Sequence, residues 1–124
     1  MVDFKKLRVW QDAHVGTLKI YKLTAKLPKS ELLGLVSQLR RAAISVELNI
    51  AESEGRFNSR EKIQFLYIAR ASIVEVRAAL AIVADLYPEI AKQAIEIGED
   101  YSSTEAQLNS LIGYRKRIKS SLSS

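Results

Sequence analysis

The residues of this sequence most suited to acid–base chemistry are its single histidine, His14, and the arginine six positions earlier, Arg8. An arginine and a histidine at such a spacing can supply a transition-state cation and a general base for RNA cleavage. A lone histidine meets so loose a pattern by chance on the order of several times in a hundred. His14 also falls at the edge of the apolar stripe of its helix. We therefore predict that the protein is not an enzyme, and keep a helical-bundle ribonuclease using Arg8 and His14 as the least favoured alternative.

Composition argues against most other site chemistry. The chain has no cysteine, which rules out disulfides and thiolate chemistry and fits a reducing compartment. One histidine cannot provide the two Glu-x-x-His pairs of a di-iron bundle, and the sequence has no glycine-rich phosphate loop. The longest apolar run, residues 78–84, is far too short to span a bilayer, and no hydrophobic signal region follows Met1. We expect a cytoplasmic protein without metal, cofactor or membrane contact.

A line of polar residues follows the helix expected around residues 37–52. It consists of Gln38, Arg41, Ser45, Asn49 and Glu52, whose spacings of three and four place them along one side of a helix. The line could be a binding site, but half-buried polar residues at helical spacing usually satisfy one another. We therefore predict a structural polar network, in which Arg41 and Glu52, together with Glu75 from the next helix, position the helices.

Four amphipathic segments connected by short loops account for the whole chain. The first ends near Leu27, because Pro28 pushes the residue before it out of the helical region. Its expected apolar stripe comprises Trp10, Ala13, Thr17, Leu18, Ile20, Tyr21 and Ala25. The second covers residues 31–54, with Ser30 as its N-cap and Gly55 as a left-handed C-cap. The third starts after a capping box formed by Asn58 and Glu61, and the fourth starts at Pro88.

Short loops between four helices favour an all-α, antiparallel up-down-up-down four-helix bundle. A chain of 124 residues with 48% hydrophobic and 27% charged residues suits a single folded domain. We place this domain at residues 1–119 and expect the polar tail, residues 120–124, to fray.

The second and third helices each carry a further apolar face. These faces comprise Leu33, Ile44, Leu48 and Ala51 on the second helix, and Tyr67, Ala71, Val74, Ala78 and Ile82 on the third. A helix that is apolar on two sides needs neighbours on both. The pattern therefore predicts a further partner for these helices without saying how many copies assemble.

Positive charge concentrates at one end of the predicted bundle. The chain has a net charge of +5, and residues 1–30 carry seven Lys or Arg against two acids. The topology brings three segments together there, contributing Lys5, Lys6, Arg8, Arg56, Arg60, Lys62, Arg115, Lys116, Arg117 and Lys119. Few acids oppose them, which is the pattern of a phosphate-backbone binder. Among the aromatic residues, Tyr114 beside Arg115 has the setting for stacking on a base, whereas Trp10 and Tyr21 are expected in the core.

An ordered set of short motifs carries a resemblance to a known family. The motifs are Phe4-x-x-Leu7-x-Val9-Trp10, Gln38-x-Arg40-Arg41-Ala42-Ala43-x-Ser45, Asn49-Ile50-Ala51-Glu52, Gly55-Arg56 and Phe65-Leu66-x-Ile68-Ala69-x-x-Ser72-x-x-Glu75. Over residues 4–86 the chain resembles the four-helix-bundle proteins encoded in intervening sequences of bacterial 23S rRNA genes, which are similar to the accessory proteins of diversity-generating retroelements. Glu47 and Ser53 depart from the proline and glycine usual in the family.

The resemblance implies a ring-like oligomer, with five copies of the bundle and the second apolar faces as subunit interfaces. It also implies a nucleic-acid ligand and a protein partner such as a reverse transcriptase. The sequence thus predicts a non-enzymatic, homopentameric scaffold that binds RNA or DNA through its basic end. The alternative is a structural or partner-binding oligomer without nucleic acid.

Overall fold

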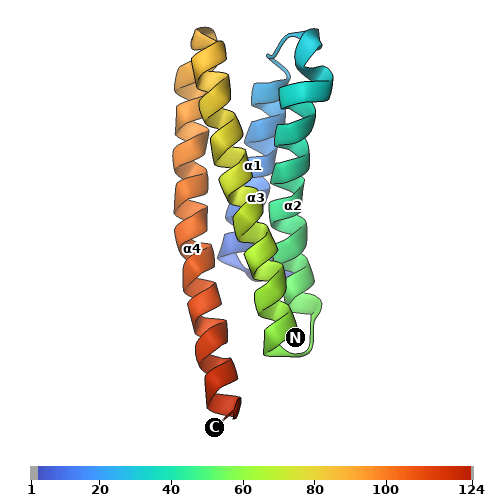
Figure 1. The fold of residues 1–124 in the computed structure, drawn as a ribbon, viewed down its shortest axis with the longest axis vertical. Helices are drawn as coiled ribbons and strands as arrows, with labels where there is room; N and C mark the ends of the chain where they lie inside the picture. Colours follow the sequence, from blue (N-terminus) through green and yellow to red (C-terminus); the bar gives the residue numbers. More distant parts are fainter. Residues whose placement is uncertain (1–2, 124) are drawn as a thin grey trace.

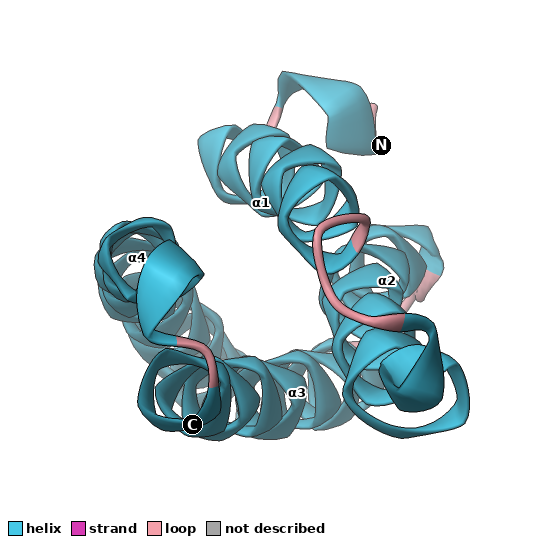
Figure 2. Ribbon diagram, turned by 90° about the horizontal axis from the view of Figure 1, so that it is seen from above, coloured by secondary structure: helices cyan, strands magenta, loops and turns pink. Residues whose placement is uncertain are grey.

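The structure of this protein, a computed structural model, describes residues 3–123 and the side chains of residues 3–119. Four long helices form a bundle in which each runs opposite to the next (Figure 1). They are α1 (Arg8–Thr24), α2 (Ser37–Gly55), α3 (Ser59–Leu86) and α4 (Ala91–Ser123). Seen from the end of the bundle, the helices are arranged around its axis in chain order, with α3 packed between α2 and α4 (Figure 2). The predicted all-α, up-down-up-down bundle is confirmed.

The second helix starts later than predicted. Lys29–Glu31 (η2) form a 3₁₀ turn and Leu32–Val36 (η3) form a π-helical turn, so that α2 begins only at Ser37. Gly34, inside the π turn, has the non-helical torsion angles φ −107° and ψ −109°, which interrupt the regular helix. Ser30 lies within the 3₁₀ turn and makes no side-chain cap, so the prediction that it caps the second helix is wrong.

The connection between α2 and α3 has one predicted cap and lacks another. The Asn58 side chain accepts the Glu61 backbone N–H at 2.8 Å, which confirms the predicted start of α3. Gly55 is not left-handed, since no residue in the described part has a positive φ. Instead the Arg56 N–H bonds the Ser53 carbonyl oxygen at 3.2 Å and the chain leaves α2 in an extended conformation at Arg56. The left-handed C-cap prediction is therefore wrong.

The other helix ends lie near their expected positions. α1 ends at Thr24, and Leu27 closes the following turn by donating its N–H to the Thr24 carbonyl oxygen at 3.1 Å. Pro88 opens the short η4 (Pro88–Ile90), which leads into α4. α4 itself runs to Ser123, past the expected domain end at residue 119. The fraying predicted for residues 120–124 falls on residues whose side chains lie outside the description.

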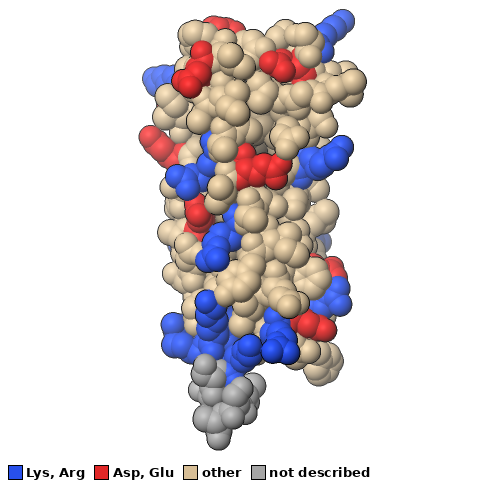
Figure 3. Space-filling view, viewed as in Figure 1, with Lys and Arg blue, Asp and Glu red and all other residues tan. Residues whose placement is uncertain are grey.

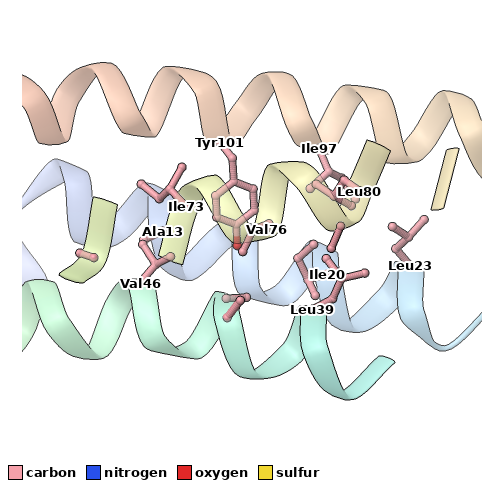
Figure 4. Packing of buried hydrophobic residues seen from close by; sticks show 14 of the residues in the cluster. Ala13, Ile20, Leu23, Leu39, Val46, Ile73, Val76, Leu80, Ile97 and Tyr101 are labelled. Atoms are coloured by element: carbon pink, nitrogen blue, oxygen red, sulfur yellow. The ribbon is translucent and has the colours of Figure 1, made fainter. Parts of the chain in front are cut away.

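The core combines one stripe from each helix (Figure 4). Its fully buried side chains include Ile20 and Leu23 from α1, Leu39, Val46 and Ile50 from α2, Leu66, Ile73, Val76 and Val83 from α3, and Tyr101 and Leu108 from α4. The stripe of α1 is narrower than predicted, because Leu18 and Tyr21 at its edge are 52% and 39% exposed. Ala25, also predicted in the stripe, is exposed. The buried positions of α1 are Val9, Ala13, Gly16, Thr17, Ile20, Leu23 and Thr24.

Tyr101 carries a polar atom into this core and depends on a glycine opposite. Its side chain is 1% exposed, and its hydroxyl oxygen is buried without a hydrogen-bond partner among the described residues. Burial raises the pKa of the Tyr101 phenol far above its usual value, so the hydroxyl stays protonated. A Cβ at Gly16 would lie 2.8 Å from both Cζ and Oη of this ring. Glycine at position 16 therefore allows α4 to place its tyrosine against α1.

We expect Gly16→Ala to lower the free energy of unfolding by about 1–3 kcal/mol, the usual cost of overpacking a core. Gly55→Ala is the matched control, because no atom lies within 4 Å of a Cβ there and its φ is not positive. At the end of α2 that control is expected to keep or raise stability through better helix propensity. Urea unfolding followed by circular dichroism measures both, and equal stability of the two variants would contradict the packing argument.

The second apolar faces of α2 and α3 lie outside the core of the single chain. Leu48, Val74 and Ile82 are 61%, 52% and 50% exposed, and Ala71 and Ala78 are also exposed. On α3 these residues form an exposed apolar stripe, although Tyr67 is half-buried against the core. On α2 only Leu48 of the predicted face is exposed, because Ile44 and Ala51 are half-buried. A stripe of this kind on a single chain is typical of a surface that another molecule covers.

Candidate nucleic-acid interface

Three segments far apart in the sequence meet at one end of the bundle. They are the 3₁₀ turn η1 (Phe4–Lys6) with the start of α1, the α2–α3 connection at residues 56–58, and the last turns of α4 (Figure 1). On the face shown in Figure 3, Lys and Arg side chains gather at this end, with few Asp or Glu side chains among them. The cations predicted for the site lie here, and their contacts divide them into two groups.

Arg115 belongs to the interior of this end. Its guanidinium donates to Glu54 at 2.7 Å, and the two side chains are only 19% and 6% exposed. Arg115 Nε is also buried and has no hydrogen-bond partner in the described part of the chain. The pair joins the end of α2 to α4, so Arg115 is a structural residue and is withdrawn from the predicted ligand-binding set.

Lys62 and Arg56 also have internal contacts. Lys62 Nζ donates to the backbone carbonyls of Ser53 and Glu54, each at 3.3 Å, and so satisfies carbonyl groups at the end of α2. Arg56 pairs with Glu52 at 2.5 Å, and its guanidinium lies 4.6 Å from the Phe65 ring centroid. The Lys62 and Arg56 side chains therefore stabilise the connection between α2 and α3.

The second group of cations faces solvent. It comprises Lys5, Lys6, Arg8, Arg60, Lys116, Arg117 and Lys119, named below as the exposed cations. Arg8 is 84% exposed, and its ion pair with Asp12 is long at 3.8 Å. Lys116 Nζ lies 5.3 Å from the Tyr67 ring centroid, which orients the side chain without neutralising it.

Three acids of this end make contacts other than with the exposed cations, although Asp12 also forms the long ion pair with Arg8. Glu54 is held by Arg115, and Asp12 accepts a hydrogen bond from Gln107 at 2.6 Å across the α1–α4 interface. Asp3 caps η1 by accepting the Lys5 backbone N–H at 3.1 Å. Among the exposed cations, Lys5, Lys6, Arg60 and Arg117 have no ion pair within the described residues, so their positive charge is not neutralised.

Two aromatic side chains stand among these cations. Phe57, in the α2–α3 connection, is 95% exposed, and Tyr114 is 49% exposed with the Arg115 guanidinium 5.6 Å from its ring. The sequence-based interpretation singled out Tyr114 and missed Phe57. The sequence did contain a signal for Phe57: it is a large apolar residue in a connection of only three residues, between Arg56 and Asn58.

The predicted polar line on α2 divides into three separate contacts. Gln38 Nε2 donates to Glu75 at 2.6 Å, and Glu52 pairs with Arg56 within the same chain segment. Ser45 Oγ is 2.8 Å from Ser72 Oγ on α3 and 3.1 Å from Asn49 Nδ2. Arg41 is exposed and has no hydrogen-bond or ion-pair partner among the described residues, because it lies on the outer face of α2. The expectation that Arg41 positions helices does not hold.

His14 pairs with a carboxylate and not with Arg8. Its Nδ1 lies 2.9 Å from Glu47 Oε2 on α2, and its ring stacks on Trp10 at a centroid distance of 5.0 Å. Trp10 in turn meets Phe4 edge to face at 5.0 Å, so it is half-buried in an aromatic stack and not in the core. The structure therefore does not bring together the Arg8–His14 pair of the ribonuclease alternative.

Two further findings limit the kinds of site present. Within the described residues, no group of three His, Cys, Asp or Glu side chains is placed to hold a metal ion. No helix in residues 3–123 is both long and apolar enough to cross a membrane.

The profile of one protein family, described as 23S rRNA-intervening sequence protein, matches residues 5–110 of the chain. The chain belongs to this family. The family assignment agrees with the resemblance seen in the sequence motifs.

A solved structure adds a fold comparison: a protein of unknown function from the S23 ribosomal protein family of Bacteroides thetaiotaomicron VPI-5482. That structure superposes with a TM-score of 0.74 at 21% identity, covering 84% of this chain and 97% of the other. No curated protein sequence matches the chain. At this identity the structural likeness shows the four-helix fold alone.

Proposed function

We propose that this member of the 23S rRNA-intervening sequence protein family binds RNA or DNA through its basic end, as a non-enzymatic oligomeric scaffold of the cytoplasm. The observation that carries the proposal is the gathering of exposed cations from three chain segments at one end of the bundle. Glu54 and Asp12 have internal contacts, and Lys5, Lys6, Arg60 and Arg117 have no ion pair within the described residues.

The chemistry of such an end suits a phosphate backbone. Lysine and arginine side chains that contact phosphates release condensed counterions, which supplies binding free energy independent of sequence. Cations spread over three chain segments suit an extended polymer better than a small ligand, which binds in a concave pocket. The family description refers to an intervening sequence of 23S rRNA, so RNA is the first ligand to test.

Filter binding of structured RNA across a salt series tests the proposal directly. We expect the strongest retention at low salt, with the logarithm of the association constant falling linearly with the logarithm of salt by about 0.7–0.9 per phosphate contact. RNA that is not retained even at low salt would exclude nucleic-acid binding by this end.

The oligomeric part of the proposal rests on the exposed apolar faces. Val74 and Ile82 on α3 are about half exposed. A groove of about 270 Å³ between α3 and α4 is lined by the small residues Ala81, Ala94, Gly98 and Ser102, together with Arg77, Leu80, Ile95 and Glu99. Small side chains let a helix of another copy approach closely. The resemblance in sequence implies that five copies form a ring, which would place five basic ends on one face.

Val74→Glu is expected to reduce the mass in solution from that of an oligomer to that of one chain, because a charge cannot be buried unpaired at an interface. Leu18→Glu is the matched control, since Leu18 is equally exposed at 52% but lies on α1, outside the two faces. Light scattering coupled to size exclusion measures both. A wild-type monomer, or the same mass for both variants, would contradict the assigned interface.

The rival function is a structural or partner-binding oligomer without nucleic acid, for example one that docks a reverse transcriptase. The exposed apolar faces support it, because they fit a protein partner as well as another copy. It differs in one measurable way: replacing exposed cations would leave its partner affinity unchanged.

A further inference from the structure

Phe57 is the most exposed large apolar side chain in the described part of the chain, at 95%. Phenylalanine at such a position forgoes the burial that the fold gives to its other apolar residues. The two other phenylalanines have neighbours: Phe4 packs on Trp10, and Phe65 lies under the Arg56 guanidinium. Phe57 alone among them is directed into solvent, at the end where the exposed cations gather.

The backbone that carries Phe57 is held firmly on both sides. Before it, the Arg56 N–H bonds Ser53; after it, Asn58 caps α3 and accepts the Lys62 N–H through its backbone oxygen at 3.1 Å. Ser53 Oγ also donates to the Lys62 carbonyl oxygen at 3.0 Å, tying α2 to α3 across the connection. The ring is thus presented on a rigid turn, so a ligand that contacts it does not have to order the connection.

The surroundings of Phe57 identify the ligand chemistry. Arg60, the second residue of α3, is exposed and has no ion-pair or hydrogen-bond partner in the described part of the chain. Tyr114 on α4 provides a further ring, 49% exposed, with the Arg115 guanidinium 5.6 Å from its centroid. Exposed aromatic rings next to cations match a strand whose bases stack on the rings while its phosphates meet the cations.

We infer that Phe57 is a base-stacking residue and that the ligand of the basic end is unpaired, single-stranded nucleic acid. The inference rests on the proposed function and names its ligand class. Bases within a duplex are already stacked and paired, so a ring on the protein surface reaches only bases in loops, bulges or free ends. A duplex of equal charge would meet the exposed cations but gain nothing from Phe57.

The test compares labelled oligouridine, which is unstructured, with a blunt RNA duplex by fluorescence anisotropy at one salt concentration. Phe57→Leu keeps an apolar side chain but removes the π face, and should weaken oligouridine binding about five- to a hundred-fold, the range of one base–aromatic stack. Duplex binding should stay unchanged. Leu18→Ala is the matched control, since Leu18 is an exposed apolar residue of α1 outside both the basic end and the two apolar faces, and it should bind oligouridine as the wild type does.

Phe57→Trp provides a direct reading of stacking, because it should keep the wild-type affinity and its indole fluorescence should be quenched by oligouridine. Unchanged oligouridine binding by Phe57→Leu, or an equal loss on duplex, would overturn the inference and leave the proposed function standing. Failure of the wild-type protein to bind either RNA at low salt would overturn both.

Discussion

Glu54→Ala is expected to lower the free energy of unfolding by about 3–5 kcal/mol, the cost of leaving the other half of a buried ion pair without its partner. Glu54 and Arg115 are 6% and 19% exposed and meet at 2.7 Å, so water cannot replace the lost carboxylate easily. Arg115 Nε is already buried without a partner, which leaves the guanidinium little other compensation. Urea unfolding at a fixed protein concentration measures the loss, since oligomerisation makes stability depend on concentration.

A nearby ion pair supplies the matched control. Glu52 pairs with Arg56 at 2.5 Å, but the two side chains are 52% and 40% exposed, so Glu52→Ala should cost at most about 1 kcal/mol. Replacing both buried partners, as Glu54→Leu with Arg115→Met, should recover most of the stability lost by Glu54→Ala. Equal losses for Glu54→Ala and Glu52→Ala would show that burial does not strengthen the Glu54–Arg115 pair.

The fold was predictable because its signals are local or periodic. The Asn58 cap needs only a residue three positions away. In α4 the spacings of three and four that connect Ala94, Ile97, Tyr101, Thr104 and Leu108 mark its inner face without any knowledge of its neighbours. Gly55 shows the limit of local rules. Its type suits a left-handed cap, but hydrogen bonds between α2 and α3 close that helix end in another way.

The sequence predicted where the cations of the candidate site gather, but not which of them make internal contacts. Topology alone places the cations at one end, but their roles depend on partners far away in the sequence. Arg115 finds Glu54 61 positions away, and Lys62 reaches carbonyl groups at the end of another helix. Neither contact has a sequence signature, so Arg115 could not be told from Lys116 beside it. The same reason explains why Arg41 was expected in a network it does not join.

A binding experiment should change the exposed cations and leave the cations with internal contacts in place. The triple variant Arg60→Gln, Lys116→Gln, Arg117→Gln removes exposed cations from two segments and leaves Arg56, Lys62 and Arg115 in their internal contacts. If each removed cation contacts one phosphate, the salt slope should fall by about 2–3, which corresponds to a loss of two to three orders of magnitude in affinity at about 0.1 M salt. Filter binding across salt measures both quantities, and circular dichroism should show an unchanged fold.

A control with the same change in net charge separates contact from long-range attraction. Lys22, Lys29 and Lys92 are exposed near the opposite end of the bundle, and their triple replacement by Gln removes an equal charge. Because attraction between charges farther apart than about 10 Å is largely screened at 0.1 M salt, this control should keep the wild-type slope. An equal fall in affinity for both triple variants would mean that nucleic acid follows the total charge of the protein, and the basic end would lose its assignment as the binding surface.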